Sequence, residues 1–224
     1  MVTERQLIYD IKGILRPKAL VTESLPEEQI RFWIKNARAA LIRQDYEKNR
    51  SINPDLVQTL CVTLEQVDSS ECGCIETGCT VLRSTCKIPK AIETYNKNLI
   101  TKVGPVDINS KAWPLKEYAL IPWMNKNKLI NKITKASIHN NYLYVISNSQ
   151  LEAKAIVRGI FEDPSELSSF TNGDSCCYSM DDAFPISMHM VDTLKRYIID
   201  TNKVMFSMDN DTIHDQMDNK RADV

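Results

Sequence analysis

The chain contains few glycines, six in 224 residues, and lacks the motifs in which glycine supports catalysis. A nucleotide site needs glycines where backbone amides approach a phosphate, but neither a GxGxxG motif nor a P-loop occurs. The GxSxG motif of serine hydrolases and the HExxH motif of zinc proteases are also missing. We therefore expect a protein that is not an enzyme and binds no cofactor.

Long apolar runs are also missing from the sequence. No run approaches the roughly 18 to 20 residues that cross a bilayer, and the charged Glu4 and Arg5 stand where a signal peptide begins its apolar region. Hydrophobic residues make up 43% and charged residues 25% of the chain, which is typical of soluble globular proteins. The sequence predicts a folded protein that is made in the cytoplasm and has no membrane partner.

Cysteine occurs seven times, an odd number that favours free thiols over a disulfide framework. Four of these residues, Cys72, Cys74, Cys79 and Cys86, lie within fifteen residues of one another, and thiolates are good zinc ligands. Their spacing is irregular, because one residue separates the first two where zinc knuckles have two to four. We interpret them as loop and core thiols and keep a zinc-binding protein as the less favoured alternative.

The first fifty residues predict two amphipathic helices joined by a short link, an αα-hairpin. Thr3 and Gln6 form a capping box at the first helix, and Ser24 with Glu27 repeats the pattern before a second helix that runs to about Tyr46. The outer face of the second helix is basic and is expected to lie in solvent: Arg31, Lys35, Arg38 and Arg43.

The middle of the chain has the period and composition of β-strands. Two asparagines, Asn140 and Asn141, tolerate the positive φ of a tight turn and predict a hairpin. The expected strands cover residues 57–65, 80–88, 99–103, 118–123, 136–138, 142–147 and 155–161.

The predicted fold is α+β, with a β-rich insertion in a helical core. Residues 1–50 form the helical hairpin, 51–162 the insertion and 163–206 the C-terminal part of the core, including a helix from Pro185 that returns to pack on the first two. Residues 207–224 carry five aspartates and few large apolar groups, so we expect an extended tail that folds on binding a partner.

Charge is segregated along the chain although its net value is only −1. Residues 1–50, 51–86, 87–135 and 136–224 carry net charges of +3, −4, +7 and −7. Head-to-tail packing of identical subunits would bring the basic and acidic parts of different copies together, and the alternative is a solvated surface. The candidate inter-subunit or DNA-facing basic residues are Lys126, Lys128, Lys132 and Lys135.

Five segments together resemble structural proteins of crAss-like and related Bacteroidetes phages. They are TERQLIYDIK at 3–12, LIRQDYEKNR at 41–50, CKIPK at 86–90, TKVGPVD at 101–107 and RGIFEDP at 158–164. The resemblance covers most of residues 1–206, and RGIFEDP is its most distinctive segment. Within that family the chain is most similar to the portal-tail adaptor, or head completion protein, whose helical core carries a β insertion.

The resemblance implies a structural virion protein of the neck or tail. Its copies would form a twelvefold ring that follows the portal, connects head to tail and lines the DNA exit channel. The implied partners are further copies, the portal protein, other tail ring proteins and, through non-specific contact, double-stranded DNA. The C-terminal extension of such adaptors docks on the portal, and the apolar anchors here would be Met208, Ile213, Met217 and Val224. The alternative is another ring subunit of the neck or tail.

Metal analysis of the purified protein tests the zinc-binding alternative. We expect no stoichiometric zinc, because the cysteine spacing does not match a zinc knuckle. Stoichiometric zinc that is lost together with stability in Cys72→Ser and Cys79→Ser variants would favour that alternative.

Overall fold

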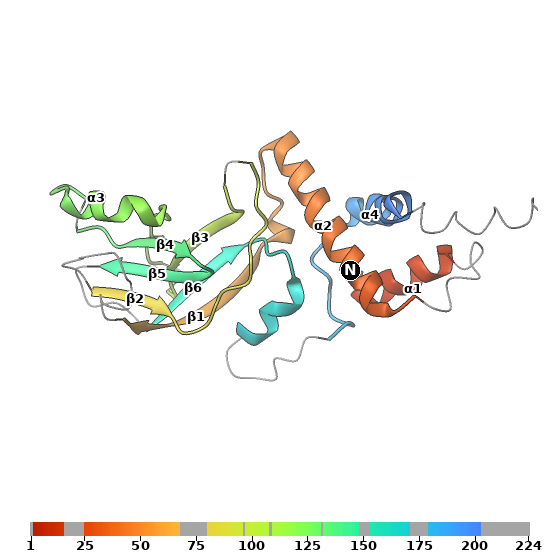
Figure 1. Ribbon diagram of the computed structural model, residues 1–224, viewed down its shortest axis with the longest axis horizontal. Coiled ribbons are helices and arrows are strands. Elements are labelled where there is room, and N and C mark those ends of the chain that lie inside the picture. The colour runs from red at the N-terminus through yellow and green to blue at the C-terminus, as the bar shows by residue number, and fades with distance from the viewer. Residues whose placement is uncertain are drawn as a thin grey trace, which may run out of the picture. The chain divides into compact units, whose positions relative to one another are not determined.

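The computed structural model describes residues 2–15, 25–67, 80–95, 97–107, 109–130, 132–147, 153–170 and 179–202 (Figure 1). The chain divides into two compact units: residues 1–51 with 179–224 form the helical unit, and residues 52–178 form the β unit. Among the described helices, none is long and apolar enough to cross a membrane.

The helical unit contains α1 (Glu4–Leu15), α2 (Glu27–Asn49) and α4 (Met188–Thr201). The capping box predicted for α1 is confirmed, because the Gln6 amide donates to Thr3 Oγ1 at 3.2 Å and the Thr3 amide donates to Gln6 Oε1 at 3.1 Å. Ser24 lies outside the described residues. Helix α4 packs on α2, as the sequence predicts.

Apolar side chains from the three helices form the core of this unit, and ion pairs link the helices at its surface. The Lys12 ammonium lies 2.7 Å from Glu27 Oε1 and joins α1 to α2. Its hydrogen bond and charge lower the pKa of the exposed Glu27 carboxyl, so this link weakens as the pH falls into the acid range. The buried core residues are Leu7, Ile8, Ile11, Leu15, Ile30, Trp33, Ile34, Ala37, Leu41, Phe184, Val191, Leu194 and Ile198.

One residue of the basic face of α2 does not lie in solvent. The Arg38 side chain is fully buried, its Nε donates to the Pro185 carbonyl at 2.7 Å, and its guanidinium lies 5.8 Å from the centre of the Phe184 ring. The segment that precedes α4 therefore covers this position. The prediction of a fully solvated basic face is wrong at Arg38, because it considered α2 without the returning chain.

The β unit is built on a six-stranded antiparallel sheet with the order β3-β6-β1-β2-β5-β4. The hairpin turn is confirmed, since Asn140 and Asn141 have φ values of 50° and 64° between the paired His139 and Tyr142. Apart from the C-terminal end of β2, the strands agree with the predicted ranges to within two residues. Their bounds are β1 (Gln58–Gln66), β2 (Thr80–Ser84), β3 (Ile100–Pro105), β4 (Lys135–His139), β5 (Tyr142–Ser147) and β6 (Lys154–Gly159).

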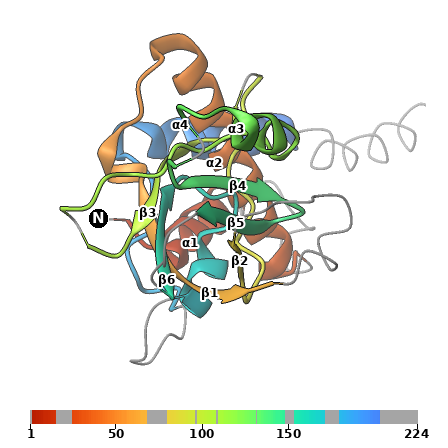
Figure 2. The same ribbon diagram turned by 90° about the vertical axis from the view of Figure 1, so that its left-hand side faces the viewer.

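A short segment between β3 and β4 joins the two edges of the sheet and makes it a near-barrel (Figure 2). The Trp113 amide donates to Val103 of β3 at 2.8 Å, while the Lys116 amide donates to Ala136 of β4 at 2.9 Å. The Ala136 amide donates in return to Pro114 at 3.0 Å. The enclosed core consists of Leu60, Val62, Leu64, Ile88, Ala91, Val103, Ala136, Leu143, Val145, Ala155, Val157, Phe161 and Leu167.

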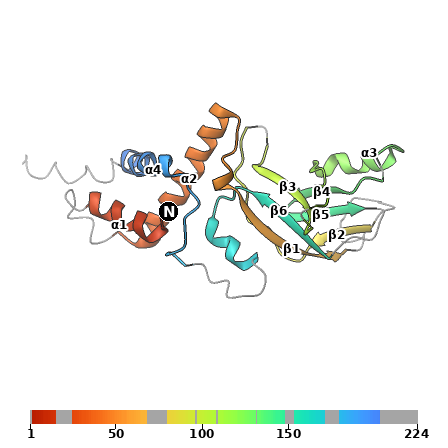
Figure 3. The same ribbon diagram turned by 180° about the vertical axis from the view of Figure 1, so that it is seen from behind.

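The strand predicted over residues 118–123 is wrong. The chain there forms a 3-10 helix, η4 (Tyr118–Leu120), followed by the α-helix α3 (Ile121–Lys126). Pro122 lies in the first turn of α3, where its missing amide costs no hydrogen bond, whereas inside a sheet it would remove one. Two further 3-10 helices, η3 (Pro54–Leu56) and η5 (Pro164–Phe170), flank the strands, and η5 contacts β1 (Figure 3).

Replacing Arg38 tests its role in the helical unit. We expect Arg38→Ala to lower the free energy of unfolding by about 3 kcal/mol, because it removes a buried charge-assisted hydrogen bond and leaves a cavity. Lys48→Ala, in the exposed last turn of α2, is the matched control and should change the free energy of unfolding by less than about 0.5 kcal/mol. Urea denaturation followed by circular dichroism measures both, and equal values would contradict a structural role for Arg38.

Candidate subunit interface

Residues 115–130 with 132 and 133, which we call the α3 lobe, are attached to the side of the near-barrel (Figure 3). Ile121 is fully buried and packs with Val81, Tyr144 and Ile146. The Tyr118 ring stacks on His139, with a centroid distance of 4.7 Å and an interplanar angle of 9°, and also contacts Tyr144. Strands β2, β4 and β5 therefore hold the inner side of the lobe in place.

The outer side of the α3 lobe exposes large apolar side chains. Trp123 is 67% exposed and Leu129 is 87% exposed, although residues of this kind usually lie in a core. Most of the exposed large apolar side chains of the described β unit lie in this lobe, where they are Leu115, Leu120, Trp123, Leu129 and Ile133. Such a concentration is typical of a protein interaction site.

Exposed lysines surround these apolar side chains. Lys126, Lys128 and Lys132 are all exposed, as is Lys116. Lys135 is different, since it lies in β4 and its side chain is 0% exposed. The sequence predicts that Lys135, like the other three candidate lysines, faces a neighbouring subunit or DNA, but its side chain is buried, because it lies on the face of the sheet that the lobe covers.

The combination of apolar and basic side chains favours a protein partner over DNA. Lysines alone suffice to contact phosphates, whereas the centres of protein interfaces are rich in aromatic and aliphatic residues. An exposed tryptophan on a supported helix is the kind of residue that contributes most binding energy in such interfaces. The α3 lobe therefore has the properties of a preformed protein-docking surface.

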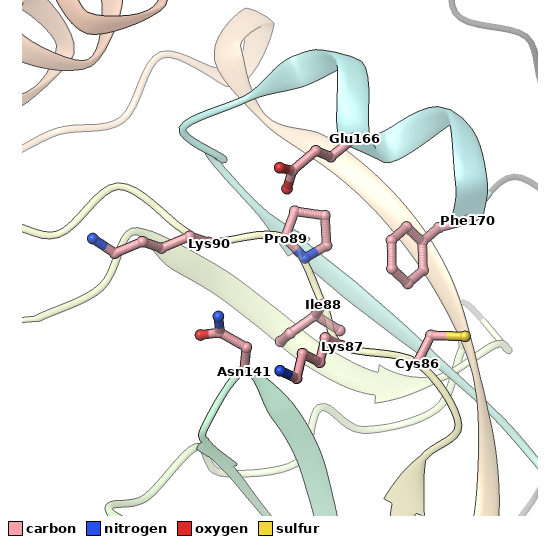
Figure 4. A pocket seen from close by; sticks show the side chains of 8 residues that line it. All are labelled: Cys86, Lys87, Ile88, Pro89, Lys90, Asn141, Glu166 and Phe170. Carbon is pink, nitrogen blue, oxygen red and sulfur yellow. The ribbon is translucent and has the colours of Figure 1, made fainter.

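A second candidate site is an open depression beside η5, with a volume of about 520 Å³ (Figure 4). Phe170 and the exposed Cys86 thiol lie at one end, and Lys90 and Asn141 lie at the other. The Lys90 ammonium lies 3.5 Å from Glu162. Among the described residues, no group of three His, Cys, Asp or Glu side chains could hold a metal ion. The depression thus offers a mixed surface without an arrangement that indicates a particular reaction.

The chain matches the model of a crAss-phage family described as phage tail ring protein 2, over residues 6–220. The chain belongs to this family. No curated protein matches it. The chain is therefore a structural ring protein of the tail of crAss-like phages, and its role is architectural and not enzymatic. The resemblance found in the sequence is confirmed at this level.

The segment RGIFEDP, which is the most distinctive part of the resemblance, has a structural role in this ring protein. Position 159 requires a glycine because the backbone of residue 99 lies very close to it. A Cβ at this position would be 2.9 Å from the Leu99 carbonyl oxygen. Phe161 is fully buried in the core, and Asp163 Oδ1 accepts the Ser165 amide at 2.8 Å at the start of η5. These residues maintain the fold and do not form an exposed site.

Several residues expected at functional sites lie outside the described part of the ring protein. They are Cys72, Cys74 and Cys79 of the cysteine cluster and the tail anchors Met208, Ile213, Met217 and Val224. Charge counting did find the exposed lysines of the α3 lobe. Charge counting does not indicate the exposed apolar residues of the lobe: Leu120 and Trp123 lie in the strand predicted over residues 118–123, and Leu129 lies in no predicted element.

Stability measurements can separate the inner and outer sides of the lobe. We expect Ile121→Ala to lower the free energy of unfolding by about 3 kcal/mol, because it leaves a cavity beneath the lobe. Leu129→Ala, which removes a side chain that is 87% exposed, should change it by less than about 0.5 kcal/mol. A large loss in Leu129→Ala would show that the outer side supports the fold and not an interaction.

Proposed function

We propose that copies of this ring protein form a closed ring of twelve between the portal and the tail, with the DNA exit channel at its centre. Ring membership comes from the family, whereas this position and copy number follow from the resemblance to portal-tail adaptors. The further partners are the portal protein and another tail ring protein. The observation that carries the proposal is the α3 lobe, an apolar and basic surface that the fold itself does not use.

A ring of identical copies requires two different surfaces on each copy, because each subunit contacts one neighbour with one surface and the other neighbour with another. The lobe is suited to be one of these surfaces. Its inner side is fixed by Ile121 and Tyr118, so little conformational entropy is lost when the outer side binds. Its lysines add electrostatic selection for an acidic partner.

Contact with DNA in this ring should be weak and independent of sequence. The net charge of the chain is −1 and its pI is about 6.3, so the protein as a whole does not attract phosphate strongly. A channel that DNA traverses during ejection requires such loose contacts. The lysines of the α3 lobe are better explained by a protein neighbour, since they alternate with apolar side chains.

A ring further down the tail is the second candidate position. The description of the family supports it, because that description names the tail and not the portal. In that position the neighbours on both sides would be other tail rings. The proposed head-to-tail contact between copies would be the same in either position.

An electron cryomicroscopy reconstruction of the intact virion neck, computed without imposed rotational symmetry, tests the proposal. We expect twelve copies of the chain in one ring that directly contacts the portal and encloses the channel. A ring separated from the portal by another protein would contradict the adaptor position and support the second candidate. Virions that lack the chain altogether would contradict a structural role in the particle.

A further inference from the structure

We propose that residues 203–224 of one copy bind the α3 lobe of the next copy in the ring. This inference rests on the proposed ring and names the contact by which its copies hold one another. It differs from the docking on the portal that the resemblance implies for residues 207–224.

The lobe determines what kind of partner it can bind. Trp123 and Leu129 present apolar surface that gains from burial, by about 25 cal/mol for each Å² removed from water. Lys126 and Lys128 lie between them in the sequence and are exposed, so a partner must also supply negative charge to the same small area. A suitable partner therefore alternates large apolar residues with acidic ones.

The C-terminal residues of the chain have this alternation. Residues 207–219 contain four aspartates and no lysine or arginine, and Met208, Ile213 and Met217 lie among these acids. Residues 68–79 are also acidic but contain one large aliphatic residue, Ile75. The C-terminal segment thus matches both properties of the lobe, whereas the other acidic segment matches only the charge.

The segment is assigned to a neighbouring copy because a ring needs a contact between unlike surfaces of successive subunits. A segment from one copy on the lobe of the next supplies such a contact. The 22 residues 203–224 can span up to about 70 Å when extended. The family model also matches through residue 220 and so includes most of this segment.

Direct binding of a peptide tests the match between segment and lobe. The probe is a fluorescent peptide of residues 203–224, and the receptor is the full-length chain carrying Met208→Ser, Ile213→Ser and Met217→Ser, so that its own segment does not compete. We expect anisotropy to show binding that weakens as salt is added. Adding Trp123→Ala to the receptor should weaken binding at least about tenfold, as loss of an interface hot spot does.

Matched controls show whether the lobe itself is responsible. Tyr95→Ala removes an aromatic side chain that is 94% exposed but lies outside the lobe, and it should leave peptide affinity unchanged. Lys126→Glu with Lys128→Glu should weaken binding, whereas Lys111→Glu with Lys154→Glu, at exposed positions elsewhere in the β unit, should not. Equal losses in lobe and control variants, or no peptide binding, would overturn the proposal.

Double-stranded DNA is tested on the same receptor. DNA binding that is lost with Lys126→Glu and Lys128→Glu, without any peptide binding, would assign the lobe to DNA and overturn the proposal. If the unmodified chain formed no rings, alone or with the portal, the proposed function would be contradicted. The peptide assay does not require ring formation, so the two failures can be distinguished.

Mixing two variants shows which copy the segment binds. One variant carries the three serine substitutions in the segment, and the other carries Trp123→Ala and Leu129→Ser in the lobe. Each alone should be monomeric in analytical ultracentrifugation, and their mixture should form dimers, because the intact lobe of the first binds the intact segment of the second. Peptide binding by the serine variant, together with an unmodified chain that stays monomeric and does not bind the peptide, would place the segment on its own copy. Rings of the serine variant that no longer bind purified portal would place it on the portal. Either result would overturn the inference.

Discussion

The hydrogen bonds that join residues 113–116 to both edge strands are the constraint on which the rest of the β unit depends. An edge strand exposes unpaired backbone groups that invite unwanted pairing. Here Trp113 pairs with β3, and Pro114 and Lys116 pair with β4, so one segment covers both edges. The chain enters η4 and α3 directly from this segment, and closure of the sheet therefore also fixes where the α3 lobe begins.

Features of the fold that depend on neighbouring residues could be predicted from the sequence. The Thr3–Gln6 capping box and the Asn140–Asn141 turn are local, since their hydrogen bonds and φ values involve residues within a few positions of each other. Burial depends on distant residues and could not be predicted in this way. Arg38 is covered by residues 184 and 185, which lie far from it in the sequence.

The candidate interface was predictable only in part for the same reason. Its lysines are apparent from charge counting, but the sequence does not show that Lys135 is buried while Lys126 and Lys128 are exposed. Residues 118–123 match a strand by composition. Only the structure shows that Ile121 faces the core and Trp123 faces solvent, because that difference follows from the helical conformation that begins near Pro122.

The proposed ring would enclose moving DNA, so its subunits would have to bind one another firmly and the DNA weakly. Each lysine that contacts a phosphate in the channel releases counterions and increases the affinity for DNA. In a ring this contribution is repeated in every copy. A basic segment such as 87–135, with a net charge of +7, would therefore retard DNA if it lined the channel. Burying part of that charge in contacts between subunits avoids the problem, and the apolar side chains beside Lys126 and Lys128 make such contacts favourable. The charge segregation along the chain is thus better explained by assembly than by DNA binding.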